Sequence, residues 1–237
     1  MQAIIVAGGK GERLRPLTTT IPKPMIPVQG KPMLEHIIMY LQTYGISEIT
    51  ITLCYLPEKI TSYFGSGEKW NISIRYIYED ENNPLGTAGS ITGAKRYIHE
   101  PFLVTYADIF RELDISHLIE FHQQKKGIAT LSVYKRYGEN PKSVIVFDQD
   151  KRITKFIERP LLNPKPHEFV FANASCYIFQ PDIFTYIPEG VKQDFGKDIF
   201  PKLIAEHQKI YAYETEGLFL DIGNKEKLAM AQQSTIR

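Results

Sequence analysis

Glycines and basic side chains gather near the start of the sequence, in an order that suits the binding of phosphate. The apolar run 3–6 is followed at once by Gly8, Gly9 and Gly11. Glycine lets a backbone approach a phosphate closely, and consecutive backbone N–H groups form a cradle for an anion. Fixed positive charge comes next in the sequence, from Arg13, Arg15 and Lys23. Together these residue types favour a polyanion such as a nucleoside triphosphate as the bound molecule.

The glycine pattern differs from two familiar phosphate-binding signatures. No Gly-Lys-Ser/Thr closes it, as a P-loop would require, and its spacing is not the G-x-G-x-x-G of dinucleotide-binding turns. Taken alone, the glycines leave two interpretations open, a phosphate cradle and a plain tight turn between a strand and a helix.

A carboxylate follows another predicted strand. Asp108 comes soon after the apolar run 101–105, and a second glycine-rich turn, 81–89, follows the strand predicted at 72–78. Open parallel sheets bind ligands outside the carboxyl ends of their strands, so these features and the first glycines converge on one edge. A carboxylate there suits Mg²⁺, which commonly binds one or two carboxylates together with substrate phosphates. A turn or helix cap is the alternative role of Asp108.

The elements that must position these residues alternate between strands and helices in the first half. Strands are predicted at 2–6, 48–53, 72–78 and 101–105, and helices at 32–44, 57–65 and 88–97. Later strands are predicted at 128–135, 143–147, 152–157, 168–179 and 208–214, and later helices at 114–125, 181–184, 197–206 and 224–232. The alternation predicts βαβ units. The expected fold class is α/β, with a Rossmann-like mixed, mostly parallel sheet, helices on both faces and a smaller lobe.

Composition narrows the class of protein. The chain has 237 residues, 43% hydrophobic and 23% charged, with a net charge of +1, which is typical of one globular domain. This balance argues against a general binder of nucleic acid or of acidic membranes. We expect a cytoplasmic protein, because no leader pattern and no membrane-spanning apolar run stands out. Cys54 and Cys176 are expected to be buried free thiols, and 163–166 a loop rather than a domain boundary.

The full string around the glycines is far more specific than the glycines alone. It reads Gly8-Gly9-x-Gly11-x-Arg13-Leu14-Arg15-Pro16-Leu17-Thr18, then Pro22-Lys23-Pro24-Met25 and Gly30-Lys31-Pro32-Met33-Leu34-Glu35. Over essentially the whole chain, the sequence resembles the sugar-1-phosphate nucleotidylyltransferases. The turn Pro84-Leu85-Gly86-Thr87-Ala88-Gly89 is most similar to their mannose- and heptose-1-phosphate guanylyltransferase branch. The resemblance implies a single domain of the nucleotide-diphospho-sugar transferase type, in which about 1–110 bind the nucleotide and about 111–237 the sugar phosphate.

The resemblance also implies roles for matching residues. Those expected to bind the nucleotide are Ala7, Gly8, Gly9, Gly11, Glu81, Pro84 and Gly86. Those expected to act in catalysis are Arg13, Lys23 and Asp108, and those expected to hold Mg²⁺ are Asp108 and Asp221, the latter in a late Asp-x-Gly segment. Those expected to bind the sugar phosphate are Glu158, Arg159 and Asn173. The sequence departs from the family pattern at Glu12 (usually Thr), Ala107 (usually Gly), Arg159 (usually Lys) and Ser175 (usually Gly).

The implied reaction is the transfer of a nucleotidyl group to a sugar 1-phosphate with Mg²⁺. GTP is favoured over UTP, because a carboxylate at Glu81 can accept from the two neighbouring N–H donors of guanine. The sugar is left open among mannose, heptose, glucose and an N-acetylated amino sugar, and a homodimer is also left open. Two other functions remain as alternatives, a cytidylyltransferase acting on phosphocholine or a similar phosphate, and a regulator that binds a nucleotide or nucleotide sugar without catalysis.

Overall fold

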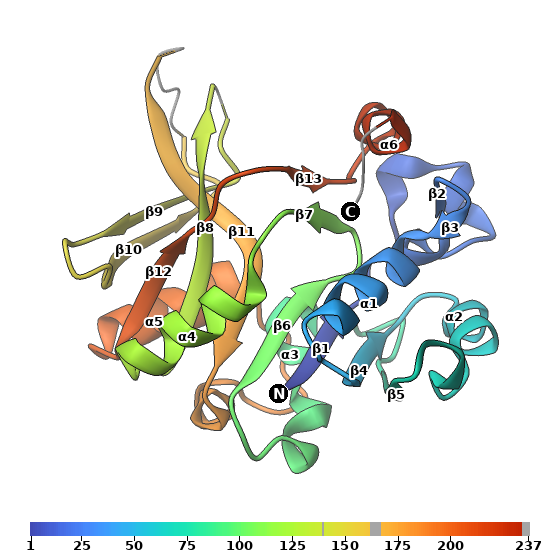
Figure 1. Cartoon of the computed structure of the whole chain (residues 1–237), viewed down its shortest axis with the longest axis horizontal. Helices are drawn as coiled ribbons and strands as arrows, with labels where there is room; N and C mark the ends of the chain where they lie inside the picture. The colour runs from blue at the N-terminus through green and yellow to red at the C-terminus, as the bar shows by residue number, and fades with distance from the viewer. Residues whose placement is uncertain (139, 162–166, 234–237) are drawn as a thin grey trace. The chain divides into compact units, whose positions relative to one another are not determined.

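The computed structural model describes residues 1–138, 140–161 and 167–233 and divides them into two compact units (Figure 1). Unit 1 comprises Met1–Pro84, Thr105–Arg111 and Leu218–Arg237, and unit 2 comprises Leu85–Val104 and Glu112–Gly217. The expected loop at 163–166 lies outside the described residues. Both units are therefore built from segments that are distant in the sequence.

Unit 1 is built around three parallel strands in the order β1 (Gln2–Val6), β4 (Glu48–Leu53) and β5 (Ser73–Tyr78). The central residues of β1 are fully buried, as expected for a strand covered on both faces. Between the strands run α1 (Met33–Thr43) and α2 (Pro57–Phe64). The buried apolar residues of α1 recur with helical spacing and are Met33, Leu34, Ile37, Ile38 and Leu41. The predicted βαβ organisation is confirmed here.

Two short antiparallel pairs complete unit 1. One joins β2 (Pro27–Val28) to β3 (Lys31–Pro32), and the other joins β7 (Ile109–Arg111) to β13 (Phe219–Asp221). The helix α6 (Lys225–Gln233) follows β13. An apolar cluster packs these pieces together and consists of Leu14, Ile26, Val28, Met33, Phe110, Leu220, Ile222 and Ala231. This cluster fixes β13 against β7, which were not predicted as strands.

Unit 2 carries the mixed part of the fold. Its antiparallel strands are β8 (Ala129–Tyr137), β9 (Ser143–Phe147), β10 (Ile153–Glu158) and β11 (Phe169–Phe179), and β12 (Ile210–Glu214) pairs with β8 in parallel. The strand β6 (Phe102–Tyr106) begins in this unit and ends in unit 1. Among the helices of unit 2 are α4 (Ile115–Lys125), α5 (Phe200–Ala205) and the short helix η6 (Pro181–Tyr186). The expected α/β class with a mixed sheet is confirmed.

The predicted helix at 88–97 is wrong in its extent. The chain forms one helical turn, α3 (Gly86–Gly89), and then a 3₁₀-helix, η5 (Thr92–Tyr97). Two N–H groups of the turn, from Ala88 and Gly89, donate to the carbonyl of Gln193, at 3.0 and 3.2 Å. A Cβ on Gly86, whose φ is +75°, would lie 2.5 Å from that carbonyl oxygen. This close backbone approach requires glycine and holds the turn in place.

The predicted helix at 197–206 is also divided. A π-helical turn at Phe195–Ile199 comes first, and α5 follows it. The side chain of Asp194 caps the turn by accepting from the N–H groups of Gly196 and Lys197.

His122 of α4 is buried in unit 2, with 1% of its surface exposed, and burial lowers its pKa to about 4. The unfolded chain binds a proton here below about pH 6.5. This site therefore contributes stability above that pH and loses it as the pH falls toward 4, by roughly 3 kcal/mol over the whole range. We expect the free energy of unfolding to fall less steeply between pH 7 and pH 4.5 in His122→Gln than in the wild type. Denaturant titrations at several pH values measure the difference, and equal slopes would contradict the prediction.

None of the helices within the described residues is long and apolar enough to cross a membrane.

Candidate functional site

The glycine-rich segment forms a tight loop directly after β1. The N–H of Ala7 donates to the carbonyl of Thr52 at 3.1 Å, which continues the pairing of β1 with β4. Gly11 has a φ of +64°, and a Cβ there would lie 2.9 Å from Thr18 Cγ2 and 3.1 Å from Lys23 Cβ. Gly9, in contrast, faces open space. The loop is therefore packed against Lys23 on one side and open at Gly9.

Lys23 is the most buried cation of this region, with 8% of its surface exposed. Its Nζ forms an ion pair with Asp108 Oδ2. Lys23 begins the short helix η3 (Lys23–Met25), whose cap is Pro22. Asp108 follows β6, where Ala107 donates its N–H to the carbonyl of Val6 at 3.0 Å. The structure thus brings together two of the three predicted catalytic residues.

Asp221 lies next to Asp108 through backbone pairing of short strands. Asp221 is the last residue of β13 and pairs with Ile109 of β7. The N–H of Ile222 donates to the carbonyl of Asp108 at 3.0 Å. Phe110 and Ile222, which belong to the apolar cluster of unit 1, are both buried. Because these two neighbouring residues are buried in the apolar cluster, they hold the backbones of the two predicted metal ligands in place.

Arg13 contacts the same region through Gly223. A Cβ built on Gly223 would lie 2.7 Å from Arg13 Nη2 and 3.3 Å from Asp221 Oδ1. The guanidinium and the carboxylate therefore border one small space beside Gly223. Unit 1 therefore holds two cations and two carboxylates in this region. The cations, Arg13 and Lys23, come after β1, whereas Asp108 follows β6 and Asp221 ends β13.

We expect Gly223→Ala to lower the turnover of the nucleotidyl transfer expected from the sequence, while leaving the melting temperature nearly unchanged. The new methyl group would displace the flexible end of Arg13 rather than backbone, so the fold can adapt at little cost. A displacement of about 1 Å in a positioning group can lower a rate by up to about a hundredfold. Steady-state kinetics and thermal unfolding test this together. A variant with normal turnover would show that Arg13 does not need its position here.

The two carboxylates fit a magnesium site completed by substrate. Asp108 and Asp221 provide the hard oxygen donors that Mg²⁺ prefers. Among the described residues, no group of three or more His, Cys, Asp or Glu side chains could form a complete protein cage for a metal.

The predicted base-binding residue Glu81 is held at the surface by Lys10, with 3.0 Å between Nζ and Oε1. Both side chains are exposed, so this pair contributes little to stability. The hydrogen bond with Glu81 raises the pKa of Lys10. Because Lys10 lies between Gly9 and Gly11, this ion pair places Glu81 beside the glycine-rich loop. Pro84 is exposed in the same segment, whereas Gly86 packs against Gln193 in unit 2.

Glu79 is a residue of this region that the sequence analysis missed. Its Oε1 would lie 3.2 Å from a Cβ on Gly8, and its N–H donates to the carbonyl of Leu53 at 2.8 Å. Cys54 lies at the same point, and burial raises the pKa of its thiol, with Glu79 adding to the effect. The signal available in the sequence was its place directly after the strand predicted at 72–78.

Glu158 lies at the end of β10 in unit 2 and is half-buried. Its Oε2 would be 2.7 Å from a Cβ on Gly196, so a side chain there would displace the carboxylate from its present position. Burial, followed by the charge of Asp194, raises the pKa of Glu158. Arg159 has a φ of +48° and a side chain that is 79% exposed, with Nε 3.9 Å from Glu158 Oε1. Arg159 and Glu158 are thus neighbours, one exposed and one half-buried.

Asn173 uses its side chain within β11. Its Nδ2 donates to the hydroxyl of Tyr177 at 2.7 Å, and its Oδ1 accepts from the N–H of Ser175 at 2.9 Å. These bonds stabilise an irregularity in the pairing of β11 with β8, where Ser175 has a φ of +56°. Glycine adopts this conformation without strain, which accounts for the usual residue at this position. Asn173 therefore has a structural role, and its predicted contact with a sugar phosphate stays a prediction.

The chain is similar to a known family of proteins. Residues 2–237 match the model of the family described as Nucleotidyl transferase. A UTP–glucose-1-phosphate uridylyltransferase of Synechocystis is 33% identical over 94% of this chain and 60% of its own length. A mannose-1-phosphate guanylyltransferase catalytic subunit beta of Dictyostelium discoideum is 34% identical over 94% of this chain and 61% of its own. The chain thus spans about 60% of the length of these curated relatives.

Crystal structures of similar proteins have the same fold. HddC from Yersinia pseudotuberculosis is 28% identical, and its crystal structure superimposes with a TM-score of 0.82, covering 98% of each chain. The same protein complexed with GMP-PN superimposes with a TM-score of 0.81. The family model covers nearly the whole sequence and includes Arg13, Lys23, Asp108 and Asp221. The chain therefore belongs to the nucleotidyl transferase family.

Proposed function

We propose that the chain transfers a nucleotidyl group from a nucleoside triphosphate to a sugar 1-phosphate. The observation that carries this proposal is the arrangement in unit 1 of Lys23 paired with Asp108 and Arg13 beside Asp221. These groups come together near an open glycine-rich loop, which is suited to a triphosphate. The relatives named above are uridylyl- and guanylyltransferases of sugar 1-phosphates, which supports the same reaction.

The reaction is a substitution at phosphorus. An oxygen of the sugar 1-phosphate attacks the α-phosphorus and forms a new P–O bond. The bond from the α-phosphorus to the bridging oxygen breaks, and pyrophosphate leaves with that electron pair. Such transfers depend mainly on positioning and on neutralisation of charge, so the protein needs no side-chain nucleophile. Lys23 donates to the α-phosphate, and Arg13 to the leaving pyrophosphate.

Asp108 and Asp221 are the residues that would hold Mg²⁺. When bound, the ion neutralises phosphate oxygens and favours departure of pyrophosphate. The protein's own contribution is to fix the two carboxylates through β7 and β13. Lys23, buried beside Asp108, supplies a second positive charge where the attacking and leaving groups are both anionic.

Residues of unit 2 provide the proposed site for the sugar phosphate. Arg159, with its exposed guanidinium, suits a bidentate contact with the phosphate. Glu158 has carboxylate oxygens that can accept from sugar hydroxyls, and burial raises the pKa of this group.

GTP is the favoured nucleotide, with UTP next. Glu81 accepts from the two donors of guanine, whereas uracil offers one N–H. The structural relative that was solved with GMP-PN supports guanine, and the Synechocystis relative supports uracil. The ratio of GTP to UTP turnover tests this choice.

The proposed function is tested by measuring pyrophosphate release with Mg²⁺. GTP, UTP, CTP, ATP and dTTP would each be paired with a panel of sugar 1-phosphates and with phosphocholine. The proposal expects pyrophosphate release with GTP, and next with UTP, only when a sugar 1-phosphate is present. Nucleotide binding without release across the panel would favour a regulator, and release with CTP and phosphocholine would favour the cytidylyltransferase.

A further inference from the structure

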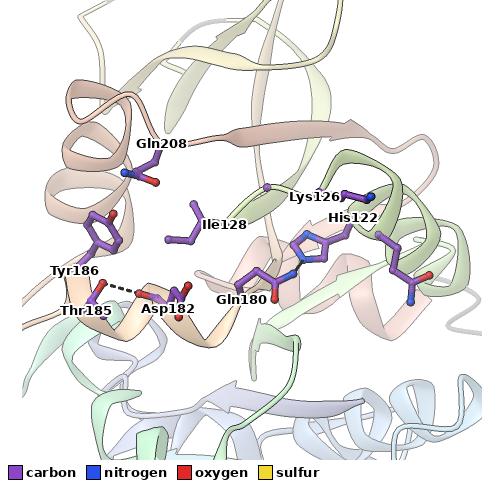
Figure 2. A pocket seen from close by; sticks show the side chains of 10 residues that line it. His122, Lys126, Ile128, Gln180, Asp182, Thr185, Tyr186 and Gln208 are labelled. Carbon is purple, nitrogen blue, oxygen red and sulfur yellow. Dashed lines mark hydrogen bonds between the residues drawn. The ribbon is translucent and has the colours of Figure 1, made fainter.

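A pocket lies wholly within unit 2 and has a volume of about 760 Å³ (Figure 2). It is formed by the end of α4, the residues after β11, the helix η6 and the turn after α5. Its polar lining includes His122, Lys126, Gln180, Asp182, Tyr186 and Gln208. The volume is in the range of pockets that bind small molecules. None of the residues assigned above to the nucleotide or to the sugar 1-phosphate lines it.

A buried hydrogen-bonded chain fixes one of these polar groups. Nδ1 of His122 lies 2.9 Å from Thr130 Oγ1, and its Nε2 lies 3.0 Å from Gln180 Nε2. Because burial lowers its pKa, His122 is neutral at pH 7. With the Gln180 amide nitrogen as donor, the imidazole Nε2 accepts and its Nδ1–H donates to Thr130. The carbonyl oxygen of Gln180 then points away from the imidazole (Figure 2). The protein thus holds a preoriented acceptor at this pocket.

The remaining lining combines opposite charges with an apolar surface. Lys126 lies near His122, whereas Asp182 lies near Thr185, and Ile128 adds an apolar side chain to the lining (Figure 2). The hydroxyl of Thr185 donates to the backbone carbonyl of Asp182 at 2.7 Å, which steadies that turn. Tyr186 adds a ring and a hydroxyl at one wall.

This set of groups matches a particular chemistry. Side-chain amides can both accept from and donate to neighbouring hydroxyls, whereas the carboxylate of Asp182 only accepts. An ammonium binds phosphate oxygens as a point charge. Apolar side chains contact the C–H face of a ring. A molecule with several hydroxyls, a compact ring and one phosphate satisfies all of them.

We infer that this pocket is a binding site for a sugar phosphate, separate from the proposed active site. Lys126 contacts the phosphate, and Asp182 and Gln180 contact hydroxyls of the sugar. The inference does not depend on the proposed nucleotidyl transfer, because every residue that carries it lies outside that machinery. It also adds a role for His122, which positions Gln180 and does not itself need to touch the ligand.

Calorimetric titration of the full chain with glucose 6-phosphate tests the inference, with glucose and inorganic phosphate as comparison probes. We expect saturable binding of glucose 6-phosphate that is stronger than binding of either comparison probe. Asp182→Asn and Lys126→Gln should each weaken it by about tenfold or more, since each removes a charged partner. Both side chains are exposed, so the variants should keep the melting temperature of the wild type.

Lys125→Gln is the matched control. Lys125 is the neighbouring residue, but its Nζ lies over the rings of Phe121 and Tyr211, at 5.6 and 5.5 Å from their centroids. This variant should bind glucose 6-phosphate as the wild type does, and so should Lys23→Ala, which alters only unit 1. Three results would overturn the inference: no binding of glucose 6-phosphate, equal affinity for inorganic phosphate or glucose, or undiminished binding by both pocket variants. None of them bears on pyrophosphate release, so failure here is distinct from failure of the proposed function.

Discussion

Lys23→Ala is expected to lower the turnover of nucleotidyl transfer by roughly a hundredfold to a thousandfold, the usual effect of removing one donor that stabilises developing charge. Lys23 is 8% exposed and paired with Asp108, so water cannot easily replace its charge. Asp108→Ala is expected to have an effect of similar size, since it removes the partner and a proposed metal ligand together. Pyrophosphate release under saturating substrates measures both.

The control for this prediction is Lys31→Ala. Lys31 is also in unit 1, but its side chain is 45% exposed and its Nζ lies 4.0 Å from Glu35 Oε1. Its loss should leave turnover within about twofold, as expected for a surface pair. Circular dichroism should show that Lys23→Ala and Asp108→Ala remain folded, because the side chain of Asp108 is 27% exposed and stays partly hydrated. Near wild-type turnover in both catalytic variants would contradict the assignment.

Asp221→Asn is expected to raise the Mg²⁺ concentration needed for half-maximal activity by at least about tenfold. The change keeps the size of the side chain and removes its charge, so β13 should still pair with β7. A calorimetric titration of Mg²⁺ in the presence of GTP measures the same loss without turnover.

Asp150→Asn provides the matched comparison for this variant, because Asp150 is an exposed carboxylate of unit 2. It should leave the Mg²⁺ dependence unchanged. If Asp221→Asn and Asp150→Asn need the same Mg²⁺ concentration for half-maximal activity, Asp221 does not hold the ion. Asp108 would then be the one proposed metal ligand left.

Much of the fold could be predicted because its signals are local. The strand predicted at 48–53 matches β4 residue for residue, since four of its six residues are the β-branched Ile and Thr that favour strands. The helix predicted at 32–44 matches α1 to within one residue at each end, because its apolar spacing and Pro32 are both local signals. Where such signals were strong, the elements of both units were confirmed.

The errors occurred where distant residues decide the local structure. The helix at 88–97 is interrupted because Gly86 and Gly89 pack against the backbone near Gln193. The pairing of β7 with β13 joins residues more than a hundred positions apart in three-residue strands, which carry too little pattern to identify.

The candidate site was predictable only in part, because its contacts also join residues that are distant in the sequence. Motifs identified Arg13, Lys23, Asp108 and Asp221, but not that Lys23 would pair with Asp108 or that Gly223 would border Arg13. Glu79 was missed because no local pattern shows that it lies against Gly8. Contacts between loops that follow different strands come from the register of the sheet, which a single sequence does not specify.

The most direct test of the proposed function follows the α-phosphorus itself. GTP labelled at the α-phosphate would be incubated with Mg²⁺, the wild-type chain and a panel of sugar 1-phosphates, and the products separated. If the proposed function is correct, the label enters a nucleotide sugar, in step with one pyrophosphate released for each product formed. Label that leaves GTP as GMP or GDP without entering a sugar product would contradict the proposed function, and so would label that stays in GTP when UTP labelled in the same way also forms no nucleotide sugar.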